Sequence, residues 1–205
     1  MAFVKYFVII FRLLIAYFAF RGTYAGWSGT VPHDMIYFTT QSNLLVGFIC
    51  VWSAFSLLFD TKQPPAWLKC ADVLYILITG LVANFVLDLS EIHCPKVLLG
   101  MTTLDMVHIV TPILFFIDFI LFNTHKTLKI KYSAFWLVYP VAYFTFILII
   151  NAANPKIGYP YPFIDLNILA INQLIVNIIV FSISFYLLGL IIVGIDRILP
   201  NKILI

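Results

Sequence analysis

Six long apolar stretches constrain the fold of this chain more than any other feature. They lie at roughly 3–21, 36–59, 67–89, 98–122, 133–150 and 167–195. A helix that crosses a bilayer needs about 20 mostly apolar residues, and the stretches meet or approach that length. Only 10% of the 205 residues are charged, against about 25% in a soluble domain. The sequence therefore predicts an all-α integral membrane protein, a bundle of six transmembrane helices that forms one domain over residues 1–205.

The distribution of positive charge predicts the orientation of these helices. The first stretch keeps Lys5 and Arg12 and has no clear cleavage site after it, so we interpret it as a retained helix. Six spans then place both termini on one side of the membrane. Cytoplasmic loops carry an excess of Lys and Arg, and the side with the termini holds more of these residues than the other side. We therefore expect both termini in the cytoplasm.

Most polar groups within the apolar stretches lie toward the side opposite the termini. Ionisable groups in hydrocarbon are costly and usually face the interior of a bundle, so a group of them at one depth predicts a functional site. The members of this group are Thr39, Thr40, Gln41, Ser42, Asn43, Asn84, Asp88, Asp105, His108, Asn167 and Asn172.

His108 is the only histidine inside a predicted span. A neutral imidazole accepts a proton near physiological pH, which suits a general base. Asp105 lies three residues earlier, on a neighbouring position of the same helix face, where it could orient the imidazole or bond to another helix. The alternative interpretation is that both residues only hold helices together through hydrogen bonds, as polar groups in membrane bundles commonly do.

Pro112 follows His108 by four residues and cannot donate to its carbonyl, so a kink is expected beside the histidine. With a span that begins near Leu98, His108 lies roughly 15 Å along the helix. Thr39 lies about one turn from the outer end of the second span. The two residues could meet if the fourth span is tilted or begins outside the hydrocarbon.

The second span begins with three hydroxyl side chains, those of Thr39, Thr40 and Ser42. A hydroxyl becomes a nucleophile when an adjacent base takes its proton, and His108 is the base available on this side. Thr39, Ser42 and Asn43 share one helix face by their spacing. The alternative for each hydroxyl is a bond to the carbonyl four residues earlier.

The amides of Asn43 and Asn84 are candidates to donate to an oxyanion. No metal or other cofactor is expected, because Glu91, His93 and Cys94 in one short loop do not supply the three or four spaced ligands that a metal site needs.

Two further features leave alternatives open. Arg12 lies near the middle of the first span, where it could bind a carboxylate head group, pair with Asp118 or Asp72, or bond to backbone carbonyls. The connection at 151–166 contains three prolines and several tyrosines. It is either a rigid lid or part of the aromatic belt at a membrane interface.

Several of these residues together carry a resemblance to a known family. The pattern consists of Phe38-Thr39, an amide-containing helical stretch, and then His108, Pro112 and Asp118. It resembles the androgen-induced-gene family of membrane threonine hydrolases. Tyr139-Pro140 and the segment 159–163 are similar to the bacterial branch of that superfamily.

The resemblance implies a six-span enzyme with cytoplasmic termini that hydrolyses fatty acid esters of hydroxy fatty acids or similar acyl esters. Its implied nucleophile is Thr39, with Thr40 as the alternative, and its implied base is His108. The implied location is a bacterial inner membrane, and the expected partners are a lipid ester and the bilayer.

A non-enzymatic lipid-binding protein or a small proton-coupled transporter is the competing class. A transporter is expected to show helix breaks at matching positions of two halves, and Pro112 and Pro140 in adjacent spans do not match in this way. No nucleic-acid or phosphate partner is expected, because the chain has no Gly-rich phosphate motif.

Overall fold

The computed structural model describes residues 2–89, 92 and 94–201. It contains six helices long and apolar enough to cross a membrane, which confirms the predicted six-span, multi-pass membrane protein. These spans are α1 (Ala2–Gly22), α3 (Phe38–Leu58), α4 (Ala66–Phe85), the run of α5 (Thr103–Asp105), η2 (Met106–Val110) and α6 (Thr111–Phe122), the pair α7 (Lys131–Phe135) and α8 (Val138–Ala153), and α9 (Ile171–Ile198).

Short elements connect the spans. They are α2 (Tyr24–Trp27), the 3₁₀ helices η1 (Pro32–Ile36), η3 (Pro155–Ile157) and η4 (Pro162–Ile164), and the strands β1 (Lys96–Leu98) and β2 (Met101–Thr102). Packing divides the chain into two compact units: unit 1 is residues 1–128 with 195–205, and unit 2 is residues 129–194. The expectation of a single domain over residues 1–205 stays a prediction.

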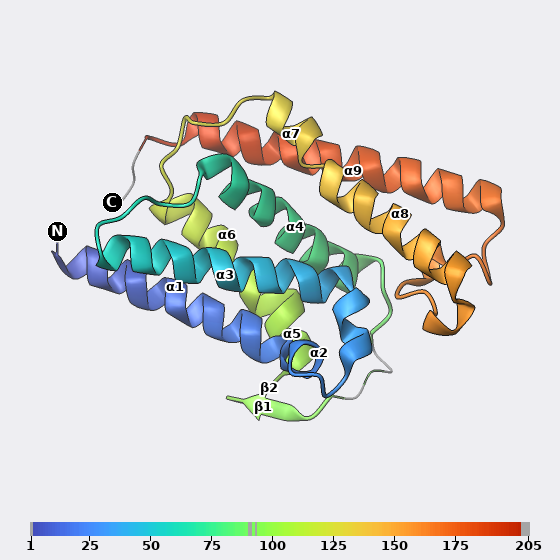
Figure 1. Cartoon of the computed structure of the whole chain (residues 1–205). Helices are drawn as coiled ribbons and strands as arrows, with labels where there is room; N and C mark the ends of the chain where they lie inside the picture. Colours follow the sequence, from blue (N-terminus) through green and yellow to red (C-terminus); the bar gives the residue numbers. More distant parts are fainter. Residues whose placement is uncertain (1, 90–91, 93, 202–205) are drawn as a thin grey trace. The chain divides into compact units, whose positions relative to one another are not determined.

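Unit 1 is built on the pairing of α1 with α3, which run alongside each other (Figure 1). Helix α4 packs against both α3 and α6, and η2 contacts α1 and α4. Side chains that are completely buried in this unit are Val8, Ile15, Ala19, Val46, Val73, Leu74, Ile76, Met106, Phe115 and Phe119. Unit 1 therefore has its own apolar core, and both Thr39 and His108 belong to it.

The fourth span begins later than the sequence predicts. The prediction placed its start at residue 98, but residues 96–102 form an antiparallel hairpin instead. Leu99 and Gly100 both have positive φ, as two-residue hairpin turns require. The helix then begins after Thr102, whose hydroxyl accepts from the backbone N–H of Asp105. Span three is also shorter than predicted, because α4 ends at Phe85 and not at residue 89.

The later start of the helix resolves the difference in depth between the two candidate catalytic residues. His108 lies only about 7 Å along the helical run that begins at Thr103. Thr39 is the second residue of α3. Both side chains thus lie within two turns of the start of their helices.

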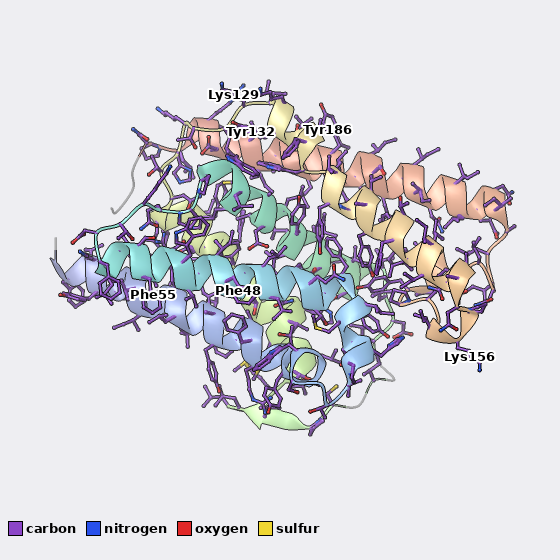
Figure 2. The ribbon with its side chains drawn as sticks, viewed as in Figure 1. Phe48, Phe55, Lys129, Tyr132, Lys156 and Tyr186 are labelled. Atoms are coloured by element: carbon purple, nitrogen blue, oxygen red, sulfur yellow. The ribbon has the colours of Figure 1, made fainter. Side chains whose placement is uncertain are left out.

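Unit 2 contains the Pro- and Tyr-rich segment. The helical run from α7 to α8 is interrupted at Trp136 and Leu137, just before Pro140. Farther along the chain, the Tyr161 and Phe163 rings stack 5.1 Å apart, and the side-chain amide of Asn177 on α9 donates to the Phe163 carbonyl. The segment therefore packs on α9 within its own unit. Lys129 and Lys156 are exposed and lie at opposite ends of this unit (Figure 2).

The outward faces of the helices are apolar. On α3, for example, Phe48 and Phe55 are 63% and 50% exposed (Figure 2). A helix that buries polar groups inside and presents aromatic and aliphatic side chains outside is suited to a lipid surround, since backbone groups are already paired within the helix.

Candidate active site

The first turn of α3 positions Thr39. Tyr37 has extended backbone dihedrals, and the helix begins at the next residue. The start of a helix carries a partial positive charge, which favours negative charge that develops nearby. Burial and the nearby Asp34 carboxylate raise the pKa of Tyr37, so this phenol is neutral at pH 7 and adds no negative charge beside Thr39.

His108 lies on η2, a π-helical segment inside the fourth span. Such segments add a residue to one turn and are frequent at functional sites. The Thr39 Oγ1 atom lies 3.4 Å from His108 Nε2. Catalytic hydrogen bonds are often this long without substrate and shorten when it binds. The structure thus brings together the two residues that the sequence paired as nucleophile and base.

Thr40 has a different environment from Thr39. Its side chain is buried. Its methyl carbon lies close to Gly26, since a Cβ added to that glycine would be 3.4 Å from it. Among the described residues, the hydroxyl that contacts His108 is that of Thr39 and not that of Thr40. The geometry therefore favours Thr39 over its neighbour as the candidate nucleophile.

Ser42 is fully buried, and its hydroxyl bonds to Thr39 and Thr79. Its hydroxyl donates to the Thr39 carbonyl at 3.2 Å and lies 2.7 Å from the Thr79 hydroxyl on α4. These contacts connect α3 to α4. Sequence reasoning missed Thr79, since a single threonine in an apolar helix gives no signal of its own.

Asn43 joins α3 to η2. Its side-chain Nδ2 donates to the Thr39 carbonyl at 2.9 Å and to the Val107 carbonyl at 3.2 Å. Two carbonyl acceptors require the NH₂ group, which fixes the orientation of the amide. Asn43 Oδ1 is buried and has no hydrogen-bond partner within the described part of the chain. Asn43 therefore offers a further group an acceptor, and not the donor that the sequence led us to expect.

Asn84 occupies a comparable position on α4. Its Nδ2 donates to the Gly80 carbonyl at 2.8 Å and to the His108 carbonyl at 3.2 Å. The His108 carbonyl is the one that Pro112 cannot pair with. Asn84 thus replaces the missing helical hydrogen bond beside the histidine, and its two N–H groups are both used.

Asp105 caps the fourth span and contributes to the site only indirectly. Its carboxylate Oδ2 accepts from the Thr102 backbone N–H at 2.7 Å and from the Thr102 hydroxyl at 2.8 Å, while its own N–H donates to that hydroxyl. This reciprocal arrangement is a capping box. It fixes where the helix begins and hence where His108 lies.

The remaining polar residues predicted at this depth belong to segments other than η2. Asp88 follows the end of α4, and Gln41 donates to the Met35 carbonyl. Asn167 and Asn172 belong to unit 2. Glu91 and His93, considered above as metal ligands, lie outside the described residues.

Arg12 pairs with Asp118, which was one of the alternatives predicted for it. Its Nε donates to Asp118 Oδ1 at 2.8 Å, and Nη2 donates to the Phe122 carbonyl at 3.1 Å. Lys69 also bonds to Asp118, through Oδ2. Sequence reasoning did not include Lys69 in this cluster.

A comparison with family models, with curated proteins and with solved structures finds no match to this chain. Its function is therefore inferred from the arrangement of residues around Thr39 and His108.

Proposed function

We propose that this protein is a membrane-embedded hydrolase that cleaves lipid esters, with Thr39 as nucleophile and His108 as general base. The observation that carries the proposal is the 3.4 Å separation of Thr39 Oγ1 from His108 Nε2. A threonine hydroxyl is a weak nucleophile by itself and needs an adjacent base to take its proton. This pair meets that requirement with residues from two different spans.

The proposed reaction is acyl transfer in two steps. His108 Nε2 takes the proton of Thr39 Oγ1 as this oxygen bonds to the ester carbonyl carbon, and the imidazolium then gives the proton to the departing alcohol. Water, deprotonated by His108, attacks the acyl-threonine and releases the fatty acid, and the threonine oxygen regains the proton. In the resting state Nε2 must lack a proton, so the imidazole carries its hydrogen on Nδ1.

Stabilisation of the oxyanion is expected from the start of α3. The partial positive charge at a helix start favours negative charge that develops nearby. The side-chain N–H groups of Asn43 and Asn84 are engaged with backbone carbonyls. We therefore assign these amides to holding η2 in place, and assign the oxyanion to the positive end of α3.

A lipid ester fits the position of this pair. Thr39 and His108 are half-buried near the ends of two membrane-spanning helices. An acyl chain can lie against apolar helix faces while its ester group reaches the polar residues near the helix ends. Fatty acid esters of hydroxy fatty acids, which the family resemblance implies, have this combination of long chains and a central ester.

Lipid binding without chemistry is the second candidate function. The observation that favours it is that neither Asn43 nor Asn84 has an N–H group left for an oxyanion. A protein that only binds lipid needs no oxyanion donors, and the polar contacts would then serve packing alone.

The test uses the full chain purified in detergent, a lipid-like fluorophosphonate probe and a panel of acyl esters. The variants are Thr39→Ala, Thr40→Ala, His108→Ala and Thr39→Ser, with Thr40→Ala as the matched control. We expect labelling and turnover to be lost in Thr39→Ala and His108→Ala, and retained in Thr40→Ala and in part in Thr39→Ser. Folded wild-type protein that shows neither labelling nor turnover, yet binds the esters, would support the binding function.

A further inference from the structure

A second polar site lies in unit 1, at the other end of α3. A cavity of about 190 Å³ is present where α3 and α6 end and α4 begins. This volume is many times the ~15 Å³ that one water molecule requires. Its polar lining comes from Arg12, Gln63, Lys69, Asn123 and Thr124. Since Leu57, also in the lining, is 18 residues after Thr39 on α3, the cavity lies about 27 Å along the helix from the candidate active site.

Two buried cations share one carboxylate at this cavity. The side chains of Arg12 and Lys69 are 3% and 6% exposed, and Asp118 is completely buried. Arg12 bonds to one oxygen of Asp118 and Lys69 to the other. Buried charge is costly unless it is paired. The three side chains together carry one net positive charge, and Lys69 Nζ also lies 5.9 Å from the centre of the Phe115 ring.

The same two cations also have N–H groups to spare. Arginine has five N–H donors and lysine has three. Arg12 makes three hydrogen bonds, to Asp118, to Phe122 and, at 3.5 Å, to Gln63. Lys69 makes one, to Asp118. Two N–H groups on each cation therefore lack an acceptor among the residues that the structure describes.

Asp72 does not supply the missing negative charge. It lies one turn beyond Lys69 on α4 and is buried. Neither of its carboxylate oxygens has a hydrogen-bond partner within residues 2–89, 92 and 94–201. It forms no ion pair with Arg12 or Lys69, and it is absent from the lining of the cavity.

The backbone offsets only part of this charge. The start of α4, which has no side-chain cap, borders the cavity with a partial positive charge. The ends of α3 and α6 border it with partial negative charges, and Arg12 already bonds to the Phe122 carbonyl. Each helix end is equivalent to about half a charge, so the three ends leave roughly −0.5 against the side-chain charge of +1, and the cavity stays positive.

We propose that this cavity binds an anionic oxygen group, a carboxylate or a phosphate, held by the unused N–H groups of Arg12 and Lys69. Such groups match both the missing charge and the free donors, because guanidinium and ammonium form their strongest hydrogen bonds to oxyanions. Gln63, Asn123 and Thr124 provide neutral polar groups around the same space. The anion is either free in solution or the head group of a lipid.

The experiment measures binding, and so it does not depend on the proposed hydrolase activity. Wild-type protein in a neutral detergent is titrated with acetate and with inorganic phosphate by calorimetry, with chloride as the reference salt. In a second arm, native mass spectrometry and thermal unfolding compare protein in phosphatidylcholine nanodiscs with and without phosphatidylglycerol or palmitate. Saturable binding in the first arm identifies a free anion, and retention of the anionic lipid in the second identifies a head group.

Lys69→Met is the diagnostic variant, because it leaves Asp118 paired with Arg12 and removes the surplus charge. We expect it to fold and to bind the anion about 10- to 100-fold more weakly, the loss expected for one hydrogen bond to a charged group. Lys5→Met is the matched control, since Lys5 pairs with Asp60 at the surface, and it should bind as wild type does. Gln63→Leu removes a neutral lining group and should weaken binding without changing the charge.

The proposal is overturned if wild-type protein shows saturable binding in neither arm, which would mean that the cavity holds only water. It is also overturned if Lys69→Met and Lys5→Met weaken binding equally, because the anion would then be attracted by surface charge.

Discussion

The side-chain amide of Asn84 on α4 donates to the backbone carbonyl of His108 on η2, at 3.2 Å. Pro112 leaves this carbonyl without its helical partner. A residue from another helix therefore completes the backbone bonding beside the candidate base, and this relationship fixes the height and direction of η2 against α4. The first prediction follows from it.

Replacing Asn84 with Ala should reduce ester hydrolysis more than it reduces stability. The amide is exposed, so water can replace part of its bonding, and the free energy of unfolding should fall by only about 0.5–1.5 kcal/mol. Displacement of η2 by a fraction of an ångström should lower turnover about 10- to 100-fold. Asn172→Ala, at an exposed position of α9, is the control. Equal turnover in both variants would show that Asn84 does not position His108.

Asn43 should stabilise the fold through its bond between helices. Both Asn43 and Asn151 are buried, both donate to the carbonyl four residues earlier, and both have an unpaired Oδ1 among the described residues. Only Asn43 also donates across helices, to Val107. Asn43→Leu should therefore cost about 0.5–2 kcal/mol more than Asn151→Leu. Unfolding midpoints in detergent measure the difference, and the reverse order would refute this role.

Gly80 should tolerate no side chain, because α4 approaches η2 closely there. A Cβ at this position would lie 3.1 Å from the His108 carbonyl oxygen and 3.2 Å from Pro112 Cβ. Gly80→Ala should push η2 away, lower turnover about tenfold or more, and destabilise the fold by about 1–3 kcal/mol. A Cβ at Gly194 would have no atom of the described residues within 4 Å beyond its chain neighbours and the backbone of its own helix, so Gly194→Ala should be neutral or stabilise the helix by up to about 1 kcal/mol. Activity and thermal unfolding of both variants decide between these outcomes.

Asp118 should be essential to the stability of unit 1. Asp118→Ala removes the carboxylate that Arg12 and Lys69 share and leaves two buried cations unpaired. Removal of one partner from a buried ion pair typically costs about 3–5 kcal/mol. Asp60→Asn breaks the exposed pair with Lys5, keeps a residue type that tolerates the positive φ at this position, and should have little effect. If the two variants unfold at the same temperature, the buried cluster is not the stabilising element that its burial indicates.

The apolar pattern alone was sufficient to predict the six spans, because a bilayer demands about 20 apolar residues for each crossing. It placed the helix ends less well. Residues 98–102 were predicted to belong to the fourth span, but a hairpin turn at Gly100 and the capping box of Thr102 and Asp105 make the helix begin later. These are local hydrogen-bonding signals, which hydropathy does not measure.

The pairing of His108 with a hydroxyl of the second span was predicted from residue chemistry, and the choice of Thr39 was implied by the family resemblance. In the tertiary structure Thr39 Oγ1 lies 3.4 Å from His108 Nε2. The rotation of α3, α4 and η2 against one another decides which threonine faces the imidazole. It also decides which carbonyls the amides of Asn43 and Asn84 bond to. That rotation is set by packing between residues more than 20 positions apart. Sequence thus determined the kind of membrane fold and the candidate residues, whereas tertiary packing decided their partners, because a hydrogen bond requires distances that only assembled helices fix.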